Sequence, residues 1–337
     1  MLSRTSALAM IVAVTSGAAF AQGELNLYSS RHYDTDERLY SDFTEATGIT
    51  INRIEGNADE LIERMQAEGA NSPVDVFMTV DTVRISRAKD LGLLQPIESA
   101  VLEERIPANL QDADNQWFAF SQRARILFYD KEDVANPPQT YQELANPEYA
   151  GKVCIRSSSN VYTQNIVAAL TAHLGEEAIG DWAKAVVANF AREPQGGDTD
   201  QLRGIVSGEC DIAMSNTYYY ARALRKDVSD LSGSTDMIGW VFPNQDDIGA
   251  HINISGGGVA ANAPNKENAI KFLEYLASEQ AQDYFSAGND EYPVVADAPI
   301  APSVEALGDF KADAIPLSDI AANIDAAQKI LGDAGWK

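Results

Sequence analysis

ELNLYS (residues 24–29), ITINRIE (residues 49–55) and VDVFMT (residues 74–79) are three short runs rich in apolar and β-branched residues. Segments with apolar residues at helical spacing separate these runs, and the first such segment ends at Gly48. Strands that alternate with helices in this way predict parallel pairing, with helices on both faces of the sheet. This part of the chain therefore favours an α/β fold.

A second series of the same kind follows in the middle of the chain. Residues 152–156 and 210–214 are strand-like, and helices are expected near residues 163–174 and 178–189. The chain is long enough for two lobes of about 150 residues each. We therefore expect each series to form the centre of one α/β lobe.

Two extended segments, residues 118–129 and 237–242, are expected to cross from one lobe to the other. Two crossings imply that each lobe is built from separated pieces of chain. Ligands of open α/β sheets bind beyond the carboxyl ends of the strands, so these edges should face each other across a cleft that closes by hinge motion. The predicted division places residues 22–121 and 249–298 in the N-terminal lobe and residues 122–248 and 299–337 in the C-terminal lobe.

The first residues resemble a secretory signal. Arg4 supplies a positive charge, residues 7–14 are apolar, and Ala19-Phe20-Ala21 places small residues at a cleavage site. The apolar stretch is shorter than the roughly 20 residues that a membrane-spanning helix needs. We therefore expect residues 1–21 to be removed and the mature chain to reside in the periplasm.

The composition excludes several classes of partner and activity. The formal net charge is -25, which disfavours nucleic acid and anionic membranes. The sequence contains no Gly-x-Ser-x-Gly, His-Glu-x-x-His or Walker pattern, so it offers no support for an enzyme. We expect a monomer that binds its ligand without catalysis.

Cys154 and Cys210 are the two cysteines of the chain. Both lie in strand-like segments, and export permits a disulfide. One structural bridge within one lobe is the interpretation that we favour. Two buried free thiols are the alternative that the spacing leaves open.

Tyrosines recur where strands end. Tyr33 follows the first strand, Tyr162 follows the strand near residue 154, and Tyr218, Tyr219 and Tyr220 follow the strand that begins at residue 210. The loops at the carboxyl ends of parallel strands can all face one cleft. Successive side chains on a helix point about 100° apart, so at least one of the three consecutive tyrosines must serve another purpose.

A cluster of phenols favours a hard cation. Phenolate is an anionic oxygen donor, and oxygen ligands suit hard metal ions. Three or four phenolates would roughly cancel the charge of Fe(III), and a bound cation can hold a phenol ionised below its usual pKa of about 10. Zinc would call for Cys and His pairs, and calcium for a carboxylate-rich loop. A sugar or polyamine stacked on the same rings is the alternative that the residues leave open.

Other polar residues lie near the expected cleft. His32 could ligate or orient a ligand. Arg123 and Arg125 are expected to point to opposite faces of the crossing strand, one lining the cleft and the other in a salt bridge. Asp75 and Asp81 are candidate carboxylates at the edge of the cleft, although Asp81 is better suited to cap a helix.

Three segments resemble the periplasmic ferric-iron-binding proteins, sometimes called bacterial transferrins, of the FutA-like branch. They are YSSRHYDTD at residues 28–36, RSSSNVY at residues 156–162 and GECDIAMSNTYYYAR at residues 208–222. The resemblance extends over the whole mature chain. It implies a two-lobed periplasmic-binding-protein fold of type II and delivery of iron to the permease of an ABC transporter.

The same resemblance implies a set of site residues. Fe(III) would be ligated by Tyr33, Tyr162, Tyr218 and Tyr219, whereas Tyr220 matches no ligand position. Members of the family differ in whether the residue equivalent to His32 is a ligand, and in whether a small anion such as carbonate, a water or an arginine completes the site. The arginines that the resemblance places behind the ligands are Arg123 and Arg222.

Overall fold

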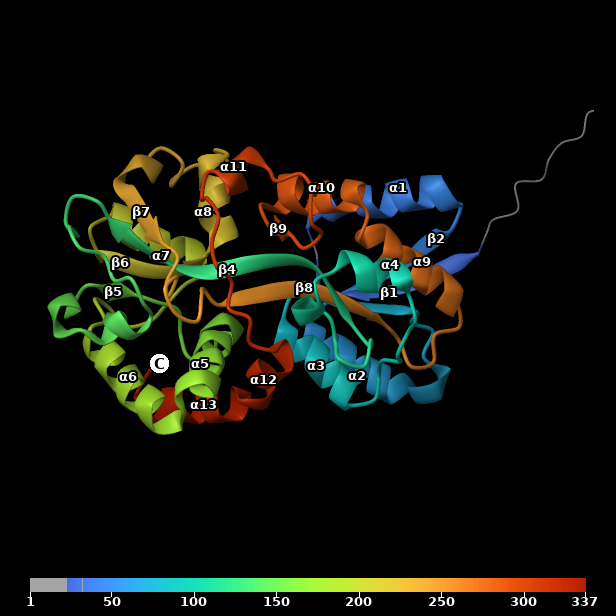
Figure 1. Cartoon of the computed structure of the whole chain (residues 1–337), viewed down its shortest axis with the longest axis horizontal. Coiled ribbons are helices and arrows are strands. Elements are labelled where there is room, and N and C mark those ends of the chain that lie inside the picture. Colours follow the sequence, from blue (N-terminus) through green and yellow to red (C-terminus); the bar gives the residue numbers. More distant parts are fainter. Residues whose placement is uncertain (1–22, 32) are drawn as a thin grey trace, which may run out of the picture.

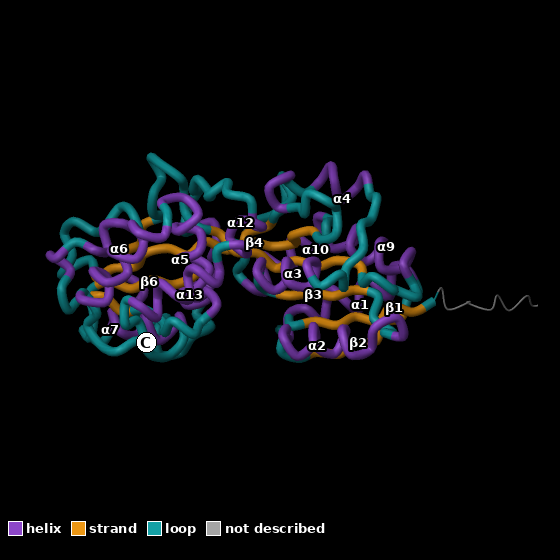
Figure 2. Tube along the Cα trace, turned by 90° about the horizontal axis from the view of Figure 1, so that it is seen from below, coloured by secondary structure: helices purple, strands orange, loops and turns teal. Residues whose placement is uncertain are grey.

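The computed structural model describes residues 23–31 and 33–337, so the predicted signal segment and His32 lie outside the described residues. The chain forms two α/β lobes joined at a narrow waist, with β4 (Phe118–Asp130) running through both (Figures 1 and 2). None of the helices in the described part of the chain has the length and apolar character that crossing a membrane requires.

The N-terminal lobe begins with the expected alternation of strands and helices. The β1, β2 and β3 strands pair in parallel in the order β2-β1-β3, as the sequence predicts. The elements are β1 (Glu24–Ser29), α1 (Glu37–Thr47), β2 (Thr50–Glu55), α2 (Ala58–Glu68), β3 (Val76–Thr79), α3 (Thr82–Asp90) and α4 (Ala100–Arg105). Four later elements complete this lobe, namely β8 (Ile252–Val259), α9 (Lys266–Leu276), α10 (Glu279–Asn289) and β9 (Tyr292–Pro293).

The helix caps explain where these helices begin. The side chain of Asn57 accepts a hydrogen bond from the backbone N–H of Asp59 at 2.9 Å, as expected of an N-cap. Asp81 caps α3 in the same way, so its predicted capping role is confirmed. The prediction for Asp75 is wrong, because this residue precedes β3 at the amino end of the strand, away from the carboxyl ends that face the cleft.

The C-terminal lobe has a smaller sheet, in which β6 pairs in parallel with β5 and antiparallel with β4. Its first elements are β5 (Val153–Cys154), α5 (Val161–Leu174), α6 (Glu176–Ala188), α7 (Asp198–Val206), β6 (Ile212–Asn216), α8 (Thr217–Leu224) and β7 (Ile238–Val241). The last helices are α11 (Pro302–Glu305), α12 (Leu317–Ala322) and α13 (Ile324–Asp333). In Figure 2, α12 lies at the waist, and it packs against both α3 and α5.

The first predicted crossing is confirmed, and the second is wrong. The β4 strand pairs with β8 as far as Ala124 and with β6 from Arg125 onward, so it changes sheet between these two residues. The expected crossing at residues 237–242 instead forms β7, which pairs with the far end of β4 within the C-terminal lobe. The chain returns through the loop that leads to β8. The precise ends of the two lobes stay a prediction.

A disulfide joins Cys154, at the end of β5, to Cys210, in the turn before β6. The two residues are 56 positions apart, and closing a loop of this length stabilises a fold by about 4 kcal/mol in the chain-entropy model. We expect the double substitution Cys154→Ala, Cys210→Ala to lower the free energy of unfolding by a few kcal/mol, measured by guanidinium denaturation. An unchanged unfolding midpoint when wild type is treated with reductant would contradict this expectation.

Candidate metal centre

The four tyrosines predicted as ligands lie where strands or loops lead into helices. Tyr33 follows β1 and precedes a short 3-10 turn, Asp34–Asp36. Tyr162 lies in the first turn of α5, and Tyr218 and Tyr219 lie in the first turn of α8. The expected loop position of Tyr162 is wrong, because α5 begins at Val161, where the side chain of Asn160 accepts a hydrogen bond from the Tyr162 N–H at 3.1 Å.

The structure brings these four phenols together from both lobes. The rings of Tyr218 and Tyr219 lie 4.1 Å apart, centroid to centroid. Tyr218 also interacts electrostatically with Tyr162 and Tyr33, and Tyr33 interacts with Tyr162. Because Tyr33 belongs to the N-terminal lobe and the other three to the C-terminal lobe, the cluster spans the space between the lobes.

Tyr220 has a different role. Its side chain is 1% exposed and packs against Phe128 and Trp240, and its hydroxyl donates a hydrogen bond to the carbonyl of Thr235 at 2.9 Å. The expectation that at least one of the three consecutive tyrosines serves another purpose is thus confirmed. Tyr220 anchors α8 on the sheet, with its ring turned away from Tyr219.

Three guanidinium groups surround the ring of Tyr162. The guanidinium carbons of Arg123, Arg125 and Arg156 lie 5.7, 5.9 and 5.6 Å from its centroid. The expectation that Arg123 and Arg125 point to opposite faces is wrong, because residues two apart on a strand project from the same face. The expected salt bridge does form, since Arg125 contacts Asp198 at 2.8 Å.

Buried donors remain beside the tyrosines. Arg123 is 1% exposed and donates one hydrogen bond, to the carbonyl of Val80. Within the described residues, Nε and Nη1 of Arg123 and Nε and Nη2 of Arg125 have no hydrogen-bond partner. Such donors suit negatively charged oxygens, since burying a guanidinium without acceptors is costly.

In the N-terminal lobe a buried arginine supports Tyr33. The guanidinium of Arg31 lies 5.0 Å from the Tyr33 ring centroid and forms ion pairs with Asp36 at 2.8 Å and Glu291 at 3.1 Å. Arg31 also donates a hydrogen bond to the hydroxyl of Ser255 at 2.6 Å. These contacts fix the start of the loop that carries Tyr33.

Three of the four phenols, those of Tyr33, Tyr218 and Tyr219, resist ionisation in the metal-free protein. Burial raises the pKa of Tyr33 to about 12, and the nearby carboxylate of Glu291 adds to this effect. Burial also raises the pKa values of Tyr218 and Tyr219, the latter with a contribution from Asp198. Holding a phenol of pKa about 12 ionised at pH 7 costs about 7 kcal/mol. A cation that binds here must supply this free energy, which favours high charge.

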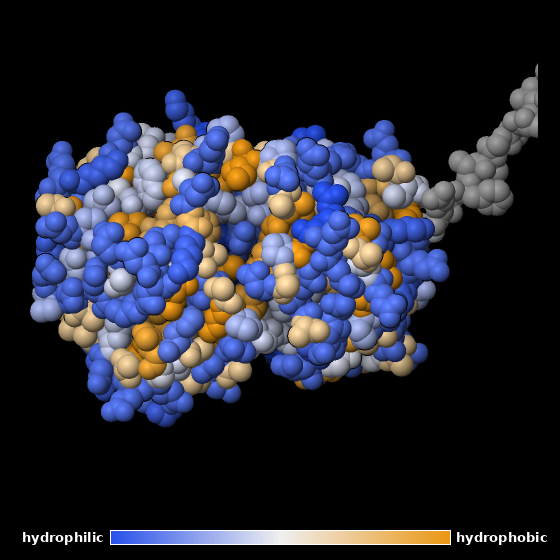
Figure 3. All heavy atoms as spheres, viewed as in Figure 1, coloured by the Kyte–Doolittle hydropathy of each residue, from blue (hydrophilic) through white to orange (hydrophobic). Residues whose placement is uncertain are grey.

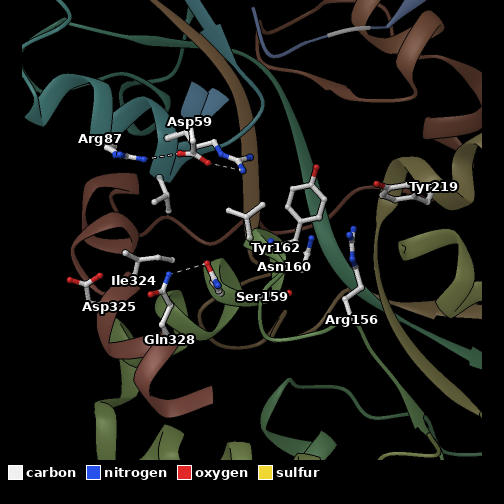
Figure 4. Close-up of a pocket in the computed structure, with 14 residues that line it drawn as sticks. Asp59, Arg87, Arg156, Ser159, Asn160, Tyr162, Tyr219, Ile324, Asp325 and Gln328 are labelled. Atoms are coloured by element: carbon white, nitrogen blue, oxygen red, sulfur yellow. Dashed lines mark hydrogen bonds and ion pairs between the residues drawn. The ribbon is translucent and has the colours of Figure 1, made fainter. Parts of the chain in front are cut away.

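A cleft of 790 Å³ opens beside the cluster. Residues of both lobes line it, and they include Arg84, Arg87, Arg156, Tyr162 and Tyr219. Figure 4 shows the Tyr219 hydroxyl directed toward the Tyr162 side of the cleft, near the guanidinium of Arg156. Figure 3 shows a largely hydrophilic face with apolar residues gathered where the lobes meet.

Two further residues, Arg222 and His32, were predicted to lie near the metal. Arg222 lies beside the cluster, with its guanidinium carbon 5.9 Å from the Tyr218 ring centroid, whereas His32 falls outside the described residues. Sequence reasoning assigned no role to Asp198, Arg156 or Arg31. The adjacency of Arg31 to the Tyr33 motif was the available signal for that residue.

The donor set is one of phenol oxygens rather than of carboxylates, thiols or imidazoles. Across the described part of the chain, no group of three or more His, Cys, Asp or Glu residues is arranged to hold a metal ion. The tyrosine cluster is the candidate centre because its hard oxygen donors match a hard ion.

Two α/β lobes that enclose a ligand site at their waist define a solute-binding protein. The chain belongs to the bacterial extracellular solute-binding protein family, whose model matches residues 71–312.

Three proteins that are similar to this chain have names that refer to iron. The chain is 49% identical to Iron uptake protein A1 of Synechocystis over 94% of this chain and 88% of the relative. The structure of Trichodesmium IdiA (FutA) in complex with iron and citrate ligands matches with a TM-score of 0.90 and 50% identity, over 94% of this chain and all of the other. The ferric binding protein of Campylobacter jejuni matches with a TM-score of 0.85 and 40% identity, over 93% of this chain and all of the other.

Proposed function

We propose that this protein captures Fe(III) in the periplasm through Tyr33, Tyr162, Tyr218 and Tyr219 and delivers it to the permease of an ABC importer. The observation that carries the proposal is the convergence of four phenols from three separate segments and both lobes. Iron would bridge the lobes, because its ligands come from each of them. The protein acts as a monomer and without catalysis.

The electrostatics of the site support a trivalent ion. The raised pKa values of Tyr33 and Tyr218 mean that these two phenols lose their protons at neutral pH only when a strong positive charge replaces them. Divalent zinc or calcium would gain less from phenolate than Fe(III), which is smaller in size and higher in charge. The names of the iron-binding relatives agree with this choice.

The cleft has room for more than a bare ion. The related Trichodesmium structure contains citrate together with iron, and the 790 Å³ cleft here is lined by Arg84, Arg87 and Arg156. These guanidiniums are suited to carboxylate groups. We propose that iron arrives as a carboxylate complex, and that a small anion such as carbonate, or a water, can complete the coordination beside the guanidinium of Arg123.

Titration of the metal-free protein with ferric citrate tests the proposal. We expect a visible phenolate-to-iron absorption band that saturates at one iron per protein, because charge transfer from phenolate requires direct coordination. Zinc and calcium should produce no such band. Parallel thermal-shift measurements with sugars and polyamines test the alternative ligand class. Stabilisation by an organic solute, with no band upon addition of iron, would refute the assignment.

A further inference from the structure

Asp198 is a buried carboxylate that joins three segments of the C-terminal lobe. It lies at the start of α7 and has no exposed surface. Its Oδ1 accepts hydrogen bonds from Nη1 of Arg125 at 2.8 Å and from the backbone N–H of Asn216 at 3.2 Å. Its Oδ2 accepts a hydrogen bond from Nη1 of Arg156 at 2.7 Å.

The hydrogen bond from the backbone N–H of Asn216 fixes the start of α8. Asn216 is the N-cap residue of this helix, and Tyr218 and Tyr219 follow in its first turn. The side-chain oxygen of Asn216 also accepts a hydrogen bond from Arg125 at 3.1 Å. The position of both tyrosines along the helix axis therefore depends on the carboxylate of Asp198.

The other two contacts position Tyr162. Arg156 lies just before the loop that leads into α5, and Arg125 lies where β4 changes sheet. Both guanidiniums approach the Tyr162 ring while they bind Asp198. One carboxylate thus orders the two cations that flank this phenol.

Charge makes this arrangement sensitive to substitution. Arg125 has a side chain that is 2% exposed, and Asp198 is its ion-pair partner. An amide in place of the carboxylate would present N–H groups to one of the two guanidiniums. Breaking a buried ion pair on one side leaves an uncompensated charge, which strongly favours rearrangement.

We propose that Asp198 is a positioning residue that holds Tyr162, Tyr218 and Tyr219 at the spacing that a single ion requires. The inference rests on the proposed ferric function and extends it to a residue that touches no iron ligand atom directly. Outer partners of metal ligands typically affect affinity by about 10- to 100-fold.

The test compares Asp198→Asn with Asp75→Asn. Asp75 is also fully buried and also accepts hydrogen bonds from backbone N–H groups, of Asn26 at 2.7 Å and Asn265 at 2.6 Å. It lies at the amino end of β3, away from the tyrosines. Both substitutions remove one buried negative charge, but only Asp198 is paired with arginines, so Asp75→Asn controls for the loss of a buried carboxylate away from the tyrosines.

Ferric titration of both variants and wild type provides the readout. We expect Asp198→Asn to weaken ferric binding by about 10- to 100-fold and to shift or reduce the iron-saturated phenolate band. Asp75→Asn should keep the wild-type band and affinity, even where its melting temperature falls. An iron-saturated Asp198→Asn protein with the wild-type band and affinity would overturn the inference, whereas a wild type without any band would instead refute the ferric function.

A second variant covers the case in which Asp198→Asn does not fold. Arg156→Gln removes one partner and leaves Asp198 bound to Arg125 and Asn216. The side chain of Arg156 is 20% exposed, so the fold should tolerate the substitution. We expect a shifted band and an affinity lowered by about tenfold. A wild-type band and affinity in Arg156→Gln would also contradict the proposal.

Discussion

Replacing Tyr219 with phenylalanine is expected to weaken ferric binding by more than about 100-fold and to reduce the visible phenolate band. The substitution removes one anionic donor and leaves the ring in place. Because the loss of outer partners alone costs about 10- to 100-fold, the loss of a direct ligand should exceed this range. Competition with a chelator of known affinity, followed at the absorption band, gives the measurement.

The neighbouring Tyr220 supplies a matched control. Tyr220→Phe removes an identical hydroxyl, one that donates to the Thr235 carbonyl instead of facing the cluster. We expect a cost to stability of about 1 kcal/mol and an unchanged ferric affinity and band. If Tyr219→Phe and Tyr220→Phe bind iron equally well, the ligand assignment of Tyr219 is wrong.

Acid is expected to release the iron steeply. In the metal-free protein the raised pKa values keep Tyr33, Tyr218 and Tyr219 protonated at neutral pH, so we expect ferric binding through these phenols to displace their protons. Below the pKa of about 12 for Tyr33, lowering the pH favours the protonated, empty site. The logarithm of the apparent affinity should therefore fall by about three for each pH unit of acidification, one for each of Tyr33, Tyr218 and Tyr219.

This dependence can be linked to a single residue. The apparent affinity of wild type and Tyr219→Phe would be measured between pH 5 and 8 in a buffer of constant ionic strength. We expect the slope for Tyr219→Phe to be smaller by about one, because one fewer proton is released. A wild-type slope near zero would mean that phenols do not supply the ligands.

Local sequence patterns were sufficient for the strands and for the placement of the tyrosines. Apolar runs bounded by turn residues gave β1, β2 and β3, and the long run at residues 118–129 gave β4. Patterns of this kind depend on residues near one another in the chain. The prediction that the segment near residue 240 crosses between the lobes was wrong for the same reason. The pairing of β7 with β4 joins segments about a hundred residues apart and leaves no local signature.

The residues that position the tyrosines, Asp198 above all, could not be predicted from local sequence patterns. Asp198 contacts Arg125 across 73 residues and Arg156 across 42 residues, and no motif surrounds it. A buried carboxylate of this kind is indistinguishable in sequence from the many acidic residues on the surface. By contrast, a Cys154–Cys210 disulfide could be favoured in advance over two free thiols, because the chain offers a single pairing, and the structure confirms it.

The unequal division of the tyrosines, with Tyr33 in one lobe and three in the other, sets an order of events for the proposed cargo. The C-terminal lobe, which carries Tyr162, Tyr218 and Tyr219, can bind an ion before the two lobes close. Approach of Tyr33 then completes the enclosure. Release can follow the reverse order. Withdrawal of Tyr33 alone would leave the ion bound to the C-terminal lobe but exposed to solvent, where an external ligand or an electron donor can reach it.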